Sequence, residues 1–525
     1  MLRLWPGGVG GGAIELREQA PVADRPPDAR APLPVAERLS NGAAGRPLSF
    51  VAPASLALAL GLWGITRQST MWRDESVTYQ VAHRTPSEIW ALLDNADAVH
   101  GLYYFLMHAL YSLWEGGLVT LRLPSVLAVA AAAGLVGLTA SRIAGHRAGV
   151  LSGLVFALTP EVQMYAQEGR SYAMVCTLVA LATWLLARAL TGPSAPRSWA
   201  LYSLAVLAAS WLHEFAVLTL MAHGVTVLLA RTTLRVRRCW AVAAGVAVIG
   251  LAPLVLFSVG QAGQVSWIGG PKPREWLEIT GVALVAVVCA RYPAATGAGP
   301  VLVVRLALPL ALLPTAVLLL AAVHEPMYVD RYVLFTNVGF ALLVGTSLSR
   351  LYTWASTLAP LRPRSARFAA VGASATAVVL ALTPVTLQMR TPDSRKDDVT
   401  AIAQEVQRVS APGDGVLFTP SRRREWRLSY PAEFGGLLDL ALERSPKASA
   451  SLQGEELPAA EIRSRMLALD RIVVLSDPPD QPQDAVEQEA VKREVLRTRF
   501  HECSRTQLKG AQVTVYARSK RCTAE

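Results

Sequence analysis

The sequence predicts an all-α membrane protein with about eleven transmembrane helices, a long first loop bearing interfacial helices, and a C-terminal α/β domain. Three observations predict this fold class. Hydrophobic residues make up 52% of the 525 residues and charged residues only 17%, whereas soluble domains average about 25% charged. Long apolar stretches recur between residues 48 and 387, with arginine clusters in alternate connections. From about residue 390 the chain is charged and contains no further span.

The first 47 residues are rich in Pro, Gly, Ala and Arg and show no apolar periodicity. The apolar run that follows begins too far from the start for an ordinary signal peptide, and no small-residue cleavage site comes after it. We therefore expect 1–47 to be a disordered, uncleaved cytoplasmic tail.

The membrane domain is expected over 48–389. One apolar stretch, 101–115, is short and rich in Tyr, and we expect it to lie in the membrane interface rather than to span. Leaving it out places the arginine-bearing loops in the cytoplasm, the amino end inside and the carboxyl end outside. The expected spans are 48–66, 121–141, 148–163, 171–190, 198–212, 214–230, 239–259, 276–290, 300–323, 331–349 and 368–387.

This topology predicts a multi-pass protein of the cell membrane, with the lipid bilayer as one partner. It places most ionisable clusters on the outer side of that membrane. The formal net charge of +11 lies in short clusters between apolar stretches rather than along one basic face. No RNA- or DNA-binding motif occurs, so nucleic acid is not an expected partner. The predicted outer segments are 67–120, 163–172, 211–214, 260–276 and 324–332.

Residues 390–525 are expected to form a soluble extracytoplasmic α/β domain. Apolar residues recur at helical spacing from Val399 to Val406, and three short β-rich runs read as strands, at 415–418, 471–475 and 512–516. Cys503 and Cys522 are the only cysteines of this part. An oxidising compartment would let them pair, and two free thiols are the alternative.

The segment Trp72–Glu75 (WRDE) directly follows the first apolar stretch. A partly desolvated carboxylate at a membrane interface can accept a proton from an attacking alcohol. The alternative is a pair of solvated loop acids. Because Trp72 and Arg73 precede the pair in what resembles a packed helix start, Asp74 and Glu75 are candidate catalytic residues.

Later in the same loop, Asp97 and His100 are spaced to share one helix face, and Tyr103 and Tyr104 follow. These four residues are candidates to line a donor or acceptor pocket. The spacing of Asp97 and His100 also suits a metal, but two ligands without a third are a weak signal. No metal site is predicted, and a purely structural role is the third alternative.

Two further outer segments carry an arginine beside a tyrosine. Arg170 lies between Glu168 and Tyr172 at the start of an apolar stretch, a costly position unless the guanidinium has an anionic partner. A lipid phosphate would supply that partner with bidentate geometry. A structural ion pair, with Glu168 or with a residue of another loop, is the alternative.

Arg331 is the second candidate phosphate ligand, and Tyr332 follows it. Pairing of Arg331 with Asp330 is the structural alternative. His213 and Glu214 form an isolated ionisable pair between two apolar stretches, and we interpret them as pocket-lining residues.

These motifs, in this order, resemble the C-type glycosyltransferase superfamily, in particular its bacterial protein-mannosyltransferase and aminoarabinose-transferase branch. The likeness covers about 50–390. Each motif is short, but their common order and common outer location make the set specific. The motifs are WRDE at 72–75, VHGLYYFLMHAL at 99–110, LRLPS at 121–125, QEGRSYAM at 167–174 and DRYVL at 330–334.

The resemblance implies inverting transfer of a sugar, mannose or another hexose or pentose, from a polyprenyl-phosphate donor to an acceptor hydroxyl. By position, Asp74 would be the base, with Glu75 as its support or as the alternative base, and Arg170 and Arg331 would hold the donor phosphate. The acceptor would be a protein, lipid or glycan of the cell envelope. The aminoarabinose branch has a lysine and a metal-binding glutamate late in the first loop. This chain has Asp97 and His100 in that region, so no cofactor is carried over and divalent-metal dependence stays open.

Two other classes of function compete with an enzyme. A flippase or transporter of lipid-linked sugars would show interrupted spans or ionisable residues near mid-membrane, whereas the charges here cluster at helix ends. A non-catalytic membrane scaffold would use its outer domain to bind a partner. The sequence contains no P-loop, no GxGxxG after a strand and no GxSxG elbow, which argues against nucleotide-driven chemistry.

Overall fold

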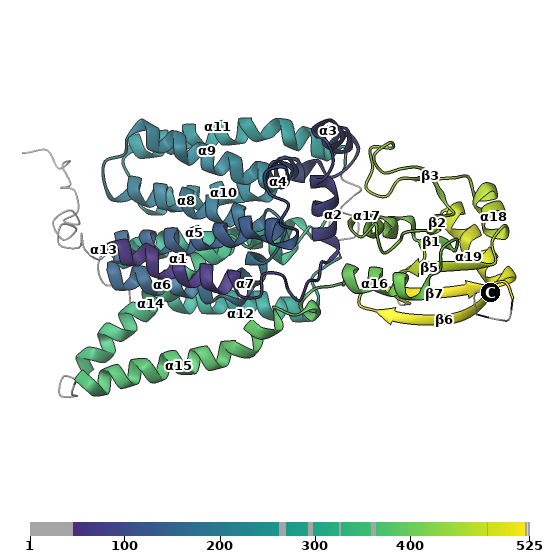
Figure 1. Ribbon diagram of the computed structural model, residues 1–525. Helices are drawn as coiled ribbons and strands as arrows, with labels where there is room; N and C mark the ends of the chain where they lie inside the picture. The colour runs from purple at the N-terminus through teal and green to yellow at the C-terminus, as the bar shows by residue number, and fades with distance from the viewer. Residues whose placement is uncertain are drawn as a thin grey trace, which may run out of the picture.

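The computed structural model describes residues 46–261, 269–291, 298–324, 327–358, 364–479, 481–519 and 522. The predicted tail therefore lies outside the described residues except for its last two positions. Figure 1 shows a bundle of roughly aligned helices with a smaller α/β domain docked against one end. The predicted fold class is thus confirmed in outline, as a mostly helical chain with C-terminal strands.

Eleven described helices make up the bundle. Among the described residues, five helices are long and apolar enough to cross a membrane: α5, α8, α11, α13 and, over Ala369–Gln388, α15. The predicted number of spans and their orientation stay predictions. The bundle helices are α1 (Arg46–Leu62), α5 (Leu118–Ala144), α6 (His146–Leu158), α8 (Tyr172–Thr191), α9 (Pro196–Leu212), α10 (Leu218–Leu229), α11 (Leu234–Val259), α12 (Pro273–Arg291), α13 (Ala298–Ala321), α14 (Thr336–Leu358) and α15 (Arg364–Gln388).

Two predicted spans have wrong boundaries. The span predicted at 148–163 ends at Leu158, because Pro160 cannot continue the helix and instead begins the short helix α7 (Pro160–Ala166). The span predicted at 331–349 begins only at Thr336, after the 3-10 turn η5 (Asp330–Val333). Both corrections move polar side chains out of spans and into connections at the end of the bundle that faces the α/β domain.

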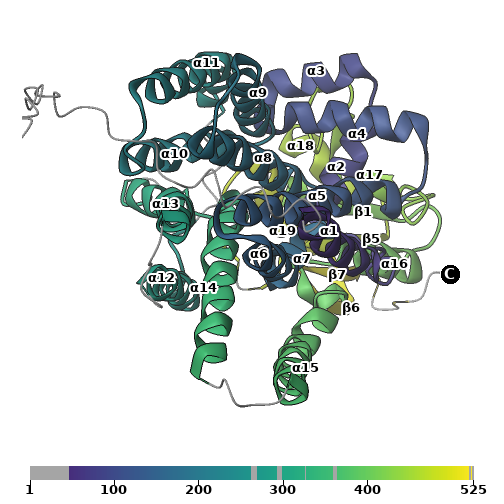
Figure 2. The ribbon, with the colours of Figure 1, turned by 90° about the vertical axis from the view of Figure 1, so that its left-hand side faces the viewer.

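Small residues let the bundle helices pack closely. A Cβ atom at Gly137 of α5 would collide with the carbonyl oxygen of Ser49 in α1, and one at Gly345 of α14 would collide with Ser152 of α6. Close backbone approach through small residues is typical of helix packing in membranes. Figure 2 shows that α15 stands apart from the other helices, and its apolar residues are mostly exposed.

The first loop folds into short helices: α2 (Arg73–Ala82), α3 (Pro86–Asn95), the 3-10 turn η2 (Ala98–His100) and α4 (Gly101–Leu113). A capping box between Thr85 and Glu88 starts α3. Helix α4 has 13 residues, a length of about 20 Å, which is shorter than the ~30 Å hydrocarbon core. This length fits the predicted interfacial helix. Apolar side chains from α2, α3 and α4 form one small core: Val77, Val81, Ile89, Leu92, Leu93 and Tyr104.

The C-terminal domain contains a five-stranded sheet in the order β2-β1-β5-β7-β6. Strand β1 pairs in parallel with β2 and β5, whereas β7 pairs antiparallel with β5 and β6. The three strands predicted from sequence correspond to β1, β5 and β7. The strands are β1 (Gly415–Thr419), β2 (Leu438–Asp439), β5 (Arg471–Ser476), β6 (His501–Leu508) and β7 (Ala511–Ala517), with a separate pair β3 (Leu442–Arg444) and β4 (Glu455–Glu456).

Helices cover both faces of this sheet because successive strand residues point to opposite sides. Val416 of β1 packs with helix α16 (Val399–Val409), whose helical spacing the sequence predicted. Leu417 packs on the other face with α18 (Ala459–Leu467) and α19 (Glu487–Arg499). Cys503 and Cys522 form a disulfide, which confirms the predicted pairing.

The C-terminal domain docks on the first-loop helices α2 and α3. Helix α17 (Glu425–Ser429) lies against α2, where the hydroxyl groups of Ser76 and Ser429 are 2.6 Å apart. A second contact lies at the far end of α2, where Arg84 Nη2 donates to the carbonyl oxygen of Ser451 at 2.9 Å. Helix α2 is therefore held between the bundle and the α/β domain.

Candidate functional site

The two acids of the WRDE segment have different environments. Consecutive residues of a helix point about 100° apart, so Asp74 and Glu75 at the start of α2 face different neighbours. Glu75 is fully buried against the bundle, whereas the side chain of Asp74 retains 24% of its exposure. The Oδ2 atom of Asp74 lies 3.5 Å from Nη2 of Arg331. Asp74 is thus the acid of the pair that solvent or a substrate can reach.

Buried donors occupy both carboxylate oxygens of Glu75. Arg122 donates from Nε to Oε1 and from Nη2 to Oε2, each at 2.7 Å, and Arg67 donates to Oε2 at 3.3 Å. The backbone N–H of Gly169 adds a bond to Oε1 at 3.1 Å. Burial by itself raises the pKa of Glu75, but the positive charges of Arg122 and Arg67 outweigh it and lower the pKa to about 2. Glu75 is therefore an ionised carboxylate that joins the first loop to α5 and to the loop before α8.

Sequence reasoning missed Arg122 and Arg67 as members of this network. Arg122 also donates to the carbonyl oxygens of Ile65 and Thr70, at 2.7 and 2.6 Å, and so fixes the chain that leads into α2. A signal was present, because an arginine at the start of an apolar stretch needs an anionic partner. The sequence did not indicate which of the nearby acids supplies it.

Asp97, His100 and Arg170 form a hydrogen-bonded chain. Asp97 Oδ1 lies 2.7 Å from His100 Nδ1, and His100 Nε2 lies 2.7 Å from Arg170 Nη2. A guanidinium only donates, so Nε2 of His100 accepts and Nδ1–H donates to Asp97, which defines a neutral imidazole. Tyr104 donates its hydroxyl to the second oxygen of Asp97. The chain holds the guanidinium of Arg170 in one orientation.

The neighbours of Asp97 in this chain also keep it ionised. Burial raises the pKa of Asp97, but the hydrogen bond from His100 and the positive charge of Arg170 outweigh this effect and hold the pKa well below its usual range. Both ring nitrogens of His100 are engaged. Among the described residues, no three His, Cys, Asp or Glu side chains are arranged to hold a metal ion.

Aromatic rings surround the second arginine. Arg331 donates from Nε to the hydroxyl of Tyr172 at 3.2 Å, and its guanidinium carbon lies 5.6 Å from the ring centre of Tyr332. The ring of His213 packs against both tyrosines, 4.5 Å from Tyr332 and 5.6 Å from Tyr172 between centres. Three separate connections of the bundle thus meet at Arg331, and Asp74 completes the contact from α2.

We call this set of residues the arginine cluster. It brings together ten of the residues that the sequence predicted for the site, from four of the five predicted outer segments. Its members are Asp74, Asp97, His100, Tyr103, Tyr104, Arg170, Tyr172, His213, Arg331 and Tyr332.

Three buried polar atoms of the arginine cluster have no hydrogen-bond partner among the residues that the structure describes: Nε of Arg170, the hydroxyl of Tyr103 and Nδ1 of His213. Leaving such an atom unsatisfied costs about 1–3 kcal/mol each, so native proteins rarely gather several in one place without a function. Arg170 is 6% exposed and Tyr103 fully buried. The arrangement leaves hydrogen-bonding capacity for a polar, anionic ligand.

Besides Glu75, two predicted site residues lie outside the arginine cluster. Glu168 pairs with Arg395 at 3.0 Å and accepts a bond from the indole of Trp72 at 2.6 Å. The alternative ion pair between Glu168 and Arg170 is therefore wrong. Burial raises the pKa of Glu168. Glu214 accepts a bond from the hydroxyl of Ser258 at 3.1 Å.

The described contacts also differ from the structural alternative for Arg331, which was pairing with Asp330. Its backbone N–H donates to Oδ1 of Asp330 at 2.7 Å, while its guanidinium turns toward Asp74 and Tyr172. Glu325, which the sequence grouped with this segment, lies outside the described residues.

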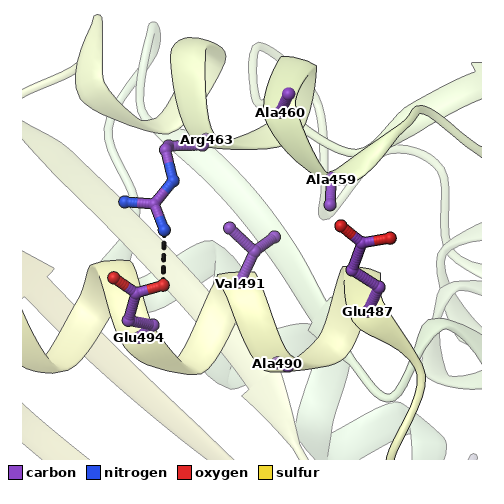
Figure 3. Close-up of a pocket in the computed structure, with 7 residues that line it drawn as sticks. All are labelled: Ala459, Ala460, Arg463, Glu487, Ala490, Val491 and Glu494. Atoms are coloured by element: carbon purple, nitrogen blue, oxygen red, sulfur yellow. Dashed lines mark hydrogen bonds and ion pairs between the residues drawn. The ribbon is translucent and has the colours of Figure 1, made fainter.

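A cavity of about 440 Å³ lies in the C-terminal domain between α18 and α19. Figure 3 shows that an ion pair between Arg463 and Glu494 crosses it. It contains no residue of the arginine cluster, and its charged groups are already paired or solvated. We therefore place the candidate site at the arginine cluster.

The chain resembles the C-type membrane glycosyltransferases in its fold and in part of its sequence, which confirms the resemblance found in the sequence motifs. The structure is similar to that of ArnT from Cupriavidus metallidurans in the apo state, with a TM-score of 0.57, 11% identity, and coverage of 90% of this chain and 98% of that chain. ArnT from Cupriavidus metallidurans bound to undecaprenyl phosphate gives a TM-score of 0.51, 12% identity, and coverage of 90% and 99%. At such low identity the likeness concerns the fold alone.

A family comparison adds a match in sequence. Residues 101–257 match the model of the family described as dolichyl-phosphate-mannose-protein mannosyltransferase. The matched segment runs from α4 into α11 and contains Arg170, Tyr172 and His213, whereas Asp74 and Arg331 lie outside it. No curated protein matches the chain.

Proposed function

We propose that the protein transfers a sugar, mannose or another hexose or pentose, from a polyprenyl-phosphate donor to an acceptor hydroxyl on the extracytoplasmic side of the membrane, with inversion. One observation carries the proposal: a partly exposed carboxylate, Asp74, stands 3.5 Å from Arg331, in the same cluster as Arg170 with its unpartnered Nε. A base beside two fixed cations suits a reaction in which an alcohol attacks and a phosphate leaves.

Arg170 and Arg331 would hold the donor phosphate. Arg170 is oriented by His100, and its free Nε–H offers a bond to a phosphate oxygen. The unpartnered hydroxyl of Tyr103 and Nδ1 of His213 supply further bonds to the phosphate or to sugar hydroxyls. Charge-assisted bonds from guanidinium groups to phosphate are short and strong, and they gain strength as negative charge develops on the leaving group.

Asp74 would act as the base. The acceptor oxygen attacks the anomeric carbon, its proton passes to Asp74, and the bond from that carbon to the phosphate oxygen breaks with its electron pair on the phosphate. Attack opposite the leaving group inverts the anomeric centre. Glu75 is assigned a structural role, because Arg122 and Arg67 occupy its oxygens and no exposed face remains. No step of this reaction is assigned to a metal.

The site lies where the ends of bundle helices meet the α/β domain (Figure 1). A donor whose isoprenoid tail stays among lipids and whose phosphosugar reaches the helix ends fits this position. The ArnT structure bound to undecaprenyl phosphate supports a polyprenyl-phosphate ligand for the fold. The disulfide between Cys503 and Cys522 supports an extracytoplasmic location of the C-terminal domain, because disulfides persist in oxidising compartments. The acceptor remains a protein, lipid or glycan hydroxyl.

The test is transfer of label from radiolabelled polyprenyl-phosphate mannose to a membrane extract by the purified full-length protein. Asp74→Asn should lower the transfer rate by about 10²–10⁴-fold, the usual contribution of a general base, while binding of undecaprenyl phosphate persists. Asp94→Asn is the matched control, because Asp94 is an exposed acid of the same loop. Full transfer by the Asp74→Asn variant would refute the assignment. Donor lipid moved across the bilayer without transfer would instead favour a flippase, and neither activity would favour a scaffold.

A further inference from the structure

The catalytic helix α2 begins without a cap of its own. Its N-cap residue, Trp72, makes no side-chain capping bond. The first N–H groups of a helix need acceptors, and the positive end of the helix dipole favours a carboxylate there. The acceptor comes from a distant part of the chain, because the backbone N–H of Arg73 donates to Oδ1 of Asp397 at 2.7 Å. Asp397 precedes α16, in the segment that leads into the C-terminal domain.

Further bonds from the C-terminal domain fix the same turn. Arg73 Nε donates to Glu425 at 2.5 Å, and the side chain of Glu425 is only 2% exposed. The backbone N–H of Met71 donates to Thr400 Oγ1, and that of Val399 donates to the Met71 carbonyl oxygen, each at 2.9 Å. The domain therefore holds residues on either side of Trp72 while Glu75 is held by the bundle. Asp74 lies between these two sets of contacts.

We propose that Asp397 is a positioning residue for sugar transfer: its carboxylate caps the start of α2 and so fixes the turn that carries Asp74. This inference rests on the proposed function, because it acts through the role of Asp74 in the reaction. It also makes the C-terminal domain part of the active site, which no motif of the first loop indicates.

The charges around Asp397 determine how its effect depends on pH. The groups that face it are Arg73 and Asp74 on α2 and Arg423 from the 3-10 turn η7 (Ser421–Arg424). Burial raises the pKa of Asp397, the bond from the Arg73 N–H lowers it, and the charge of Asp74 raises it. The resulting pKa is about 7.

Near neutral pH, Asp397 thus changes from a neutral acid to an anion as the pH rises. The anion is the better cap, because it accepts the Arg73 N–H bond more strongly and faces the positive end of the helix dipole. The transfer rate should therefore rise through a limb centred near pH 7.

Two substitutions separate the cap from the charge. Asp397→Ala removes both, and we expect kcat to fall by up to about 100-fold, because a small misplacement of a catalytic group has effects of this size. The KM for the lipid donor should change by no more than about two-fold. The reason is that the substitution removes no contact that binds the donor equally in the ground and transition states. Asp397→Asn keeps an oxygen that can accept from Arg73, so it should retain more activity but lose the limb near pH 7.

Asp393→Asn is the matched control, because Asp393 lies on the same segment and its side chain is 83% exposed. It should leave both kcat and the pH profile unchanged. Wild-type kcat in Asp397→Ala, or an intact limb near pH 7 in Asp397→Asn, would overturn the proposal. If Asp397→Ala does not fold, the pH profile of the isosteric Asp397→Asn decides alone. Loss of transfer in Asp74→Asn with no effect at Asp397 would overturn this inference but not the proposed function.

Discussion

The replacement Glu75→Gln tests whether the second acid of the WRDE segment is structural. Glu75 accepts from Arg122 through two bonds, from Arg67 and from the Gly169 N–H, in a fully buried position. A glutamine keeps the shape and one acceptor oxygen. Its amide nitrogen, however, would face guanidinium donors, and two buried positive charges would lose their counter-ion.

The structure gives an expected size for this effect. Removing one partner of a buried ion pair costs about 3–5 kcal/mol, because the remaining charge is left uncompensated. Since about 1.4 kcal/mol corresponds to a tenfold change in an equilibrium constant, the ratio of folded to unfolded protein should fall by more than about 100-fold. The wild-type contribution is present above the usual glutamate pKa of about 4.3. It is lost as the pH falls toward about 2.

The assay is the fraction of detergent-solubilised protein that stays monodisperse after heating, measured by size-exclusion chromatography. Glu75→Gln should lower the midpoint temperature strongly, whereas Asp74→Asn, with a partly exposed side chain, should change it little. The opposite pattern would refute this reasoning. A Glu75→Gln variant as stable as wild type but without transfer activity would return Glu75 to the role of base.

Two further predictions concern Arg331 and the disulfide. Arg331→Ala should raise the KM for the polyprenyl-phosphate sugar, measured in the transfer assay, and unchanged kinetics would assign Arg331 a structural role. Cys503→Ser should lower the stability of the C-terminal domain by roughly 3 kcal/mol, the chain-entropy value for a loop of this length; the two cysteines are 19 residues apart. The midpoint temperature of the Cys503→Ser variant should not change when reductant is added, whereas that of the wild-type protein should fall. An equal change in the variant and the wild type would contradict the prediction.

Periodicity and charge made much of the architecture predictable. The helical spacing of Val399, Ile402 and Val406 gave α16, and the β-rich runs gave β1, β5 and β7. The predicted breaks between spans were right where a polar residue interrupts the stretch, as at His213 between α9 and α10. They were wrong at Pro160, where the predicted span extended past a residue at which the backbone cannot continue the helix.

Most residues that meet in the arginine cluster were predictable from the sequence, but the different environments of Asp74 and Glu75 were not. Short motifs at helix ends pointed to Arg170, Arg331 and Asp74 because each places a charge at a costly depth. Which of two adjacent acids faces the bundle depends on where Arg122 and Arg67 lie, and these residues come from other elements. Asp397 leaves no local pattern, because its bond to Arg73 spans 324 positions in the chain.

The charge balance of the arginine cluster explains why Arg331 is expected to affect KM more than kcat. In the resting protein Arg331 faces the carboxylate of Asp74 at 3.5 Å. In the proposed reaction Asp74 takes up a proton and becomes neutral while the departing phosphate gains a negative charge. Arg331 then has an anionic partner before and after transfer, so it adds binding that differs little between ground and transition state. Arg170, held by the neutral His100, has no carboxylate within ion-pairing distance in the described part of the chain and should contribute more to the transition state.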